Sequence, residues 1–149
     1  DEFSTSAYAW LAGQLDIPVL GPEYASGKMQ TRAEWIVRGA ADIIRAGVPD
    51  VGGIGPTMKI AHLAESHGMT CEIHYHGAGN LHVLGAISNG RWYERGLLHP
   101  FLDYEQTPAW LNSPVDPMDD DGFVPLSSRP GLGEDINFDY IRDNLVAAW

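Results

Sequence analysis

The sequence has 149 residues, 44% of them hydrophobic, and carries a formal net charge of −11 with a pI of about 4.7. A chain of this length and hydrophobic content can bury a core, which excludes an intrinsically disordered protein. The acidic balance argues against a nucleic-acid-binding protein, because such proteins need basic patches. It leaves open an anionic small-molecule ligand, since a divalent cation can supply the local positive charge.

Cysteine content and hydropathy narrow the class further. Cys71 is the only cysteine, so neither an intrachain disulfide nor a zinc site built from cysteines can form. No apolar run is long enough to cross a membrane. Residues 1–3 lack the basic and apolar regions of a signal peptide. We therefore expect a cytoplasmic protein with no membrane association.

Helical and strand-like patterns alternate along the first two-thirds of the chain. Ser4 or Thr5 can cap a first helix. Thr31 followed by Glu34 forms a capping box before a later helix. Gly68 is placed to end the most strongly patterned helix. The predicted elements, in chain order, are a helix over 4–15, a strand over 17–20, a helix over 31–39, a strand over 42–44, a helix over 57–67, a strand over 69–74, a helix over 80–87, a very short strand over 92–94 and, after an irregular stretch over 99–133, a helix over 137–147.

Strands and helices that alternate through short loops indicate an α/β fold with a parallel sheet. Four parallel strands cannot close a barrel, and an open half leaves two strand edges exposed. We therefore expect the second half of a barrel, with the last four strands in residues 1–98 and a C-terminal segment in residues 99–149. The first half would precede Asp1, which makes the N-terminal half of the same protein an expected partner.

Polar side chains stand at the ends of several predicted strands, where parallel barrels collect their chemistry. Glu23 follows a Gly-Pro pair and is either a solvated loop residue or a ligand for a hard cation such as Mg²⁺. Alternation along a strand places His74 and His76 on one face with Glu72. These histidines are candidates for metal ligands, for a general base or for hydrogen-bonded structural residues.

Glu94 lies directly after two aromatic residues, Trp92 and Tyr93. Shielding by these rings predicts a raised pKa, so that a protonated Glu94 can donate a hydrogen bond to an oxyanion. The alternative is a salt bridge to Arg91 or Arg95, which flank it closely.

Two further stretches carry no cofactor signature. Gly52-Gly53 with Gly55 matches no nucleotide-binding pattern and predicts a tight turn between a strand and a helix. The acidic stretch 116–122 lacks the spaced ligands and terminal glutamate of a calcium loop, so we expect a solvated acidic turn there.

Taken in order, these motifs resemble the mandelate racemase and muconate lactonizing enzyme type of the enolase superfamily, over essentially the whole chain. The resemblance implies the C-terminal half of a modified TIM barrel of the (β/α)7β type, followed by a closing segment and a C-terminal helix. The stretches that carry it are Ile17-Pro18-Val19 leading to Glu23, the Gly52-Gly53-Ile54 turn with the helix over 59–65, His74, Trp92-Tyr93-Glu94-Arg95, Asp121-Gly122-Phe123-Val124 and Pro130-Gly131-Leu132-Gly133.

The resemblance also implies a chemistry, the Mg²⁺-assisted abstraction of a proton next to a carboxylate to give an enediolate. Glu23 falls on a metal-binding carboxylate, and the other Mg²⁺ ligands are expected upstream of residue 1. His74 falls on a catalytic histidine and Glu94 on an acid that hydrogen-bonds the intermediate. His76 is a candidate for substrate binding. A small-molecule carboxylate substrate and a homo-oligomer are implied as well.

One position departs from the family pattern. The aspartate that hydrogen-bonds the catalytic histidine is replaced by Gly47, and Asp50 three residues later is the candidate substitute. Without this partner an imidazole loses orientation and basicity, at about 1.4 kcal/mol for each pKa unit. This favours an acid-sugar dehydratase, a hydro-lyase in which His74 assists loss of the β-hydroxyl and the base lies upstream. A racemase, an epimerase or a lactone cycloisomerase on the same scaffold, and a non-catalytic barrel with a relic site, remain as alternatives.

Overall fold

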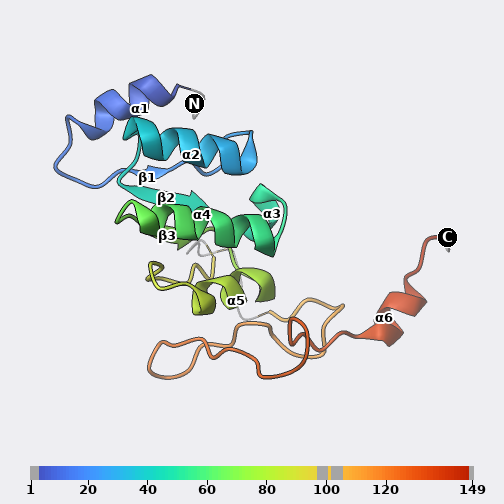
Figure 1. Cartoon of the computed structure of the whole chain (residues 1–149). Helices are drawn as coiled ribbons and strands as arrows, with labels where there is room; N and C mark the ends of the chain where they lie inside the picture. The colour runs from blue at the N-terminus through green and yellow to red at the C-terminus, as the bar shows by residue number, and fades with distance from the viewer. Residues whose placement is uncertain (1–3, 97–100, 102–105, 148–149) are drawn as a thin grey trace.

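The computed structural model describes residues 4–96, 101 and 106–147 (Figure 1). None of the helices in these ranges has the length and apolarity that a bilayer crossing demands. The elements in chain order are α1 (Thr5–Ala12), β1 (Leu20–Gly21), α2 (Lys28–Arg38), β2 (Ile43–Ala46), α3 (Val48–Val51), α4 (Ile54–Ser66), β3 (Thr70–Ile73), α5 (Ala78–Ala86) and α6 (Phe138–Asp143).

The strands form a parallel sheet in the order β1-β2-β3, which confirms the predicted α/β class. In its register Gly21 lies opposite Ile44, and Arg45 lies opposite Glu72. The helix α2 connects β1 to β2, and α3 with α4 connects β2 to β3. Parallel neighbours need such crossovers, because the chain must return to the same end of the sheet.

The fourth predicted strand, over 92–94, is wrong, since residues 91–96 contain no strand. The Trp92 N–H donates to the Glu72 side chain at 3.2 Å. In a parallel sheet this N–H would donate to a backbone carbonyl of the neighbouring strand, but here it donates to a side-chain carboxylate. The stretch therefore runs beside β3 without pairing with it as a strand.

The core lies between the sheet and its helices. Figure 1 shows α2 and α4 across one face of the strands, and alternation turns Ile44 and Ala46 of β2 toward them. The other face carries Ile43 and Arg45 and borders an open groove of about 760 Å³. The buried core cluster comprises Trp35, Ile36, Ala40, Ala41, Ile44, Ala46, Val51, Ile60, Ala61, Ala64, Cys71, Ile73 and Val83.

Several helices begin or end at glycine residues, and only one of the two predicted N-terminal caps is present. Ser4 does cap α1, accepting from Ala7 N–H at 3.4 Å. The predicted capping box at Thr31 is wrong, because α2 begins at Lys28 after Gly27 and places Thr31 inside the helix. Its hydroxyl is one turn too late to reach the orphan N–H groups of the helix start, and it donates instead to a backbone carbonyl.

The predicted tight turn is present at Gly52-Gly53, but it joins two helices, α3 and α4, where a strand-to-helix turn was expected. Gly52 has φ 92° and ends α3, and Gly53 has φ 120° and precedes α4. Both values lie in the left-handed region that a side chain disfavours. The glycine pair therefore lets the chain turn from α3 into α4, which starts three residues earlier than predicted.

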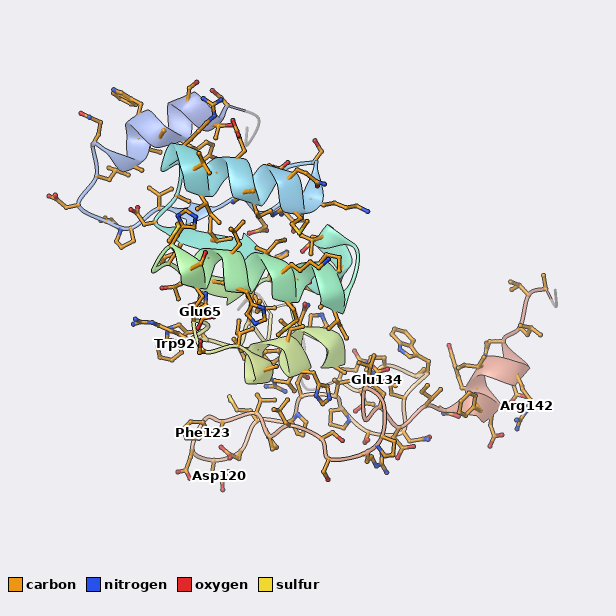
Figure 2. The ribbon with its side chains drawn as sticks, in the orientation of Figure 1. Glu65, Trp92, Asp120, Phe123, Glu134 and Arg142 are labelled. Atoms are coloured by element: carbon orange, nitrogen blue, oxygen red, sulfur yellow. The ribbon has the colours of Figure 1, made fainter. Side chains whose placement is uncertain are left out.

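The C-terminal segment runs below α5 in Figure 1, and α6 stands away from the sheet, as the position of Arg142 in Figure 2 shows. Asn137 caps α6, with its Oδ1 accepting from Tyr140 N–H at 3.0 Å. The helix ends at Asp143 and is shorter than the predicted 137–147. Pocket-lining residues of α5 and of residues 113–135 face each other across a small cavity, which places this segment beside α5.

Candidate active site

Four ionisable side chains meet at the carboxyl end of the sheet. Glu23 follows β1 by two residues, Arg45 lies near the end of β2, and His74 follows β3 directly. Parallel strands bring their carboxyl ends to one edge, so residues distant in sequence become neighbours. Glu94 joins them from the stretch that follows β3 in space.

Arg45 is the centre of this cluster, and its side chain is 14% exposed. Its Nε lies 3.1 Å from Glu23 Oε2 in an ion pair whose angle does not make a hydrogen bond. Its Nη2 donates to Glu94 Oε2 and lies 2.7 Å from His74 Nδ1. Two carboxylates thus flank one guanidinium, which balances much of the charge that burial would otherwise leave unpaired.

The His74 ring is buried and contacted on both nitrogens. Nε2 lies 3.2 Å from the Tyr24 hydroxyl and 3.4 Å from Glu23 Oε1. The Tyr24 ring meets the imidazole edge-on at 5.4 Å between centroids. A guanidinium has only donors, so Nδ1 accepts from Arg45 and the ring proton lies on Nε2. His74 therefore presents an N–H on the side of Glu23 and Tyr24.

Glu94 differs from its predicted state. Burial raises its pKa, but the Arg45 guanidinium and the Tyr75 N–H outweigh burial and hold the pKa below its ordinary value. Trp92 is 77% exposed and projects outward in Figure 2, so its ring does not give the expected shielding. The prediction of a protonated Glu94 is wrong for this arrangement, and the residue is an ionised acceptor. Its carboxylate forms a salt bridge with Arg45.

Asp50 approaches His74 without forming a hydrogen bond to it. Its Oδ2 is buried and has no hydrogen-bond partner among the described residues. A Cβ built on Gly47 would come well under 3.0 Å from this oxygen, and 3.3 Å from His74 Cβ. The Asp50 carboxylate therefore occupies the space beside His74 that a side chain at position 47 would fill.

His76 does not join the cluster through any contact found in the described part of the chain. The strand β3 ends at Ile73, and Tyr75 has φ 76°, so the alternation that would align His76 with His74 stops. His76 is exposed and packs against the Tyr75 ring, with centroids 4.2 Å apart. Its predicted role in substrate binding stays a prediction.

Comparison with known proteins identifies the family. Residues 2–140 match the profile of the family described as Enolase C-terminal domain-like. The chain belongs to this family. This match confirms the resemblance to enzymes of the mandelate racemase type that the sequence motifs indicated.

Relatives within the family include enzymes of several kinds. The chain is 60% identical to a crystal structure of D-glucarate dehydratase from Agrobacterium tumefaciens complexed with magnesium, over 99% of this chain and 38% of that one, with a TM-score of 0.95. It is 31% identical to L-talarate/galactarate dehydratase of Salmonella typhimurium over 89% of this chain and 31% of that protein. D-galactarolactone cycloisomerase of Agrobacterium fabrum is 28% identical over 92% of this chain and 38% of that protein. The chain thus spans about a third of the length of these relatives.

A metal ion could draw on only part of this cluster. Within residues 4–96, 101 and 106–147, no group of three or more His, Cys, Asp or Glu side chains is arranged to hold one. Glu23 fits as a single ligand, because its carboxylate is a hard oxygen donor at the strand end and is 30% exposed. The remaining ligands of an enolase-type magnesium site would have to come from other parts of the barrel.

Arg45 and Tyr24 are site residues that sequence reasoning missed. A cation within the apolar run of β2 was a usable signal for Arg45, since a buried charge must be paired. Tyr24 gave no signal beyond its place next to Glu23. Its pKa is raised by the hydrogen bond to Glu23, by burial and by the charges of Glu23 and Asp50.

Proposed function

We propose that the protein is a Mg²⁺-dependent acid-sugar dehydratase, a hydro-lyase of the enolase superfamily. The proposal is supported by 60% identity to a magnesium-bound D-glucarate dehydratase over nearly the whole chain. Because the chain covers 38% of that protein, the activity of the whole enzyme is inferred. The finer fold is part of the proposal, with residues 1–98 as the second half of a (β/α)7β barrel and 99–149 as the segment that closes it.

The contact between Arg45 and His74 is the observation that favours dehydration over racemisation. A racemase needs a base on each face of the substrate carbon, whereas a proton on Nε2 makes His74 a donor. In dehydration a separate base takes the proton next to the carboxylate, and the electron pair forms a carbon–carbon double bond as the bond to the β-hydroxyl breaks. The hydroxyl leaves as water after it takes up the proton that the base removed, which returns the base to its starting state. We assign His74 Nε2–H to hydrogen-bond the departing oxygen, and we place the base and the other metal ligands upstream of residue 1.

The remaining residues hold this arrangement. Magnesium, when bound, supplies positive charge that makes the proton next to the substrate carboxylate more acidic. Glu23 is the ligand that this chain offers to it. Glu94 accepts from Arg45 and fixes the guanidinium against the imidazole, so the ring keeps its tautomer. His76 is proposed to contact the substrate from the exposed loop beyond His74.

A lactone cycloisomerase is the second candidate, because one relative of that activity is 28% identical over 92% of this chain. The two reactions share proton transfer next to a carboxyl carbon and differ in the group that leaves. Analysis of the product therefore separates them.

The test is incubation of the protein with Mg²⁺ and a panel of acid sugars that includes D-glucarate, galactarate and L-talarate. We expect 2-keto-3-deoxy products, and loss of turnover in His74→Ala and Glu94→Gln. Glu23→Gln should weaken Mg²⁺ binding, measured by calorimetry, by about tenfold or more, since a carboxylate becomes a neutral amide. Absence of product and of substrate proton exchange in D₂O would rule out both reactions.

A further inference from the structure

The loop over residues 74–77, between β3 and α5, is fixed at nearly every backbone group. Tyr75 has φ 76°, in the left-handed region that an aromatic residue rarely adopts. Its N–H donates to the Glu94 carboxylate. The carbonyls of Tyr75 and His76 both accept from Asn80 Nδ2, at 3.2 and 3.3 Å. A strained backbone of this kind persists only where its surroundings hold it.

A further hydrogen bond to the backbone of this loop comes from a residue outside the sheet. The Gly77 N–H donates to the Tyr93 hydroxyl at 2.8 Å, and that hydroxyl donates to Asp116 Oδ2 at 2.6 Å. A phenol has one proton, so donation to Asp116 leaves its lone pairs for Gly77. Asp116 is 9% exposed, and Arg95 Nε donates to its carbonyl at 2.9 Å. The expected solvated turn is therefore wrong at Asp116, which is buried and paired.

We propose that Tyr93 and Asp116 are positioning residues, which fix the 74–77 loop from the C-terminal segment and so set the distance between His74 and Glu94. The two site residues lie on the two stretches that the Tyr93 hydroxyl joins. Glu94 follows Tyr93 directly, and His74 begins the loop that ends at the bonded glycine. The catalytic meaning rests on the proposed dehydration, whereas the mechanical coupling does not.

The first experiment replaces Tyr93 with Phe, which keeps the ring and removes the oxygen that both partners share. We expect kcat for the acid sugar to fall about 10-fold to 100-fold with KM within about threefold, because misplaced groups slow the chemical step more than they weaken binding. Peptide hydrogen exchange that includes Gly77 should quicken by about tenfold. The matched control is Tyr140→Phe, which removes the same atom from an exposed ring on α6 and should change neither quantity.

A second pair of variants tests the carboxylate end. Asp116→Asn keeps an oxygen acceptor for Tyr93, so we expect kcat and loop exchange close to those of the unaltered protein. Asp116→Ala removes the acceptor and should reproduce the Tyr93→Phe result. The double variant Tyr93→Phe with Asp116→Ala should be no worse than either single change, since both act through one hydroxyl.

The outcomes separate this inference from the proposed function. Turnover by the unaltered protein with an unchanged kcat in Tyr93→Phe would overturn the positioning role, whatever the loop exchange shows. Unchanged exchange at Gly77 would overturn the coupling itself. If the unaltered protein has no dehydratase activity, the proposed function fails, and the exchange of Gly77 in Tyr93→Phe alone decides the coupling.

Discussion

Gly47→Ala tests whether the space beside His74 is filled as the structure describes. Gly47 has φ −142° and ψ 145°, an extended conformation that alanine adopts without strain. The cost of the new methyl group must therefore come from its neighbours. It would lie well under 3.0 Å from Asp50 Oδ2 and 3.0 Å from the His74 carbonyl oxygen, and neither is the end of a long flexible side chain.

The expected magnitude follows from this crowding. Overpacking of a close-packed site costs about 1–3 kcal/mol, and the lower entropy of the unfolded alanine chain returns about 0.4–1 kcal/mol. We expect a net loss of roughly 1–2 kcal/mol, or about 2–8 °C in the thermal midpoint for a domain of this size. Dehydratase activity should fall as well, because the His74 backbone must move away from the methyl group.

The control and the compensating change use the same assay of thermal unfolding. A Cβ on Gly55 in α4 meets nothing within 4 Å, so Gly55→Ala should be neutral or stabilising by up to about 1 kcal/mol. Asp50→Ala removes an oxygen that has no hydrogen-bond partner in the described part of the chain, and it should restore part of the stability lost in Gly47→Ala. If Gly47→Ala is as stable as the unaltered protein, or if the two changes add within about 0.3 kcal/mol, the described packing is refuted.

Three further predictions concern charged and buried groups. Arg45→Met should lower kcat about 100-fold or more, and Arg45→Lys should lower it less, because either change removes the fixed guanidinium donor to His74 Nδ1. Equal kcat values in the unaltered protein and the two variants would contradict this prediction. Burial raises the pKa of Cys71 to about 12, so iodoacetamide should label it only after unfolding. Burial and the hydrogen bond to Asp116 raise the pKa of Tyr93. Above pH 10 the unfolded chain then loses a proton that the folded protein keeps, and the free energy of unfolding should fall by about 1.4 kcal/mol per pH unit; Tyr93→Phe should lack this term, and parallel pH profiles would be evidence against it.

The sequence determined the fold class and most of the strand ends. Alternating periodicities predicted parallel strands joined by helices, and the carboxyl ends of such strands must share an edge. Glu23 and His74 follow from this rule, since each stands at the end of a predicted strand or shortly after it. The tight turn at Gly52-Gly53 could also be predicted from the sequence, because only glycine takes two successive positive φ values without strain.

Local patterns failed where long-range contacts compete with them. The stretch over 92–94 reads as a strand, but Trp92 N–H is taken by the Glu72 side chain. The S/T-x-x-E pattern at Thr31 reads as a helix start, but the helix already begins after Gly27. In both cases a residue outside the short sequence pattern decides the local structure, Glu72 in the first case and Gly27 in the second. A pattern of a few residues does not include these positions, so it could not predict their effect.

Charge states were decided by tertiary structure alone. Nothing near Glu94 in the sequence indicates that Arg45, 49 residues earlier, would bind its carboxylate and hold its pKa low. The space that Asp50 fills beside Gly47 likewise depends on how α3 packs against the start of the 74–77 loop. Residue types and strand ends are local properties of the chain, whereas pKa values and packing depend on which distant groups the fold brings within a few ångströms.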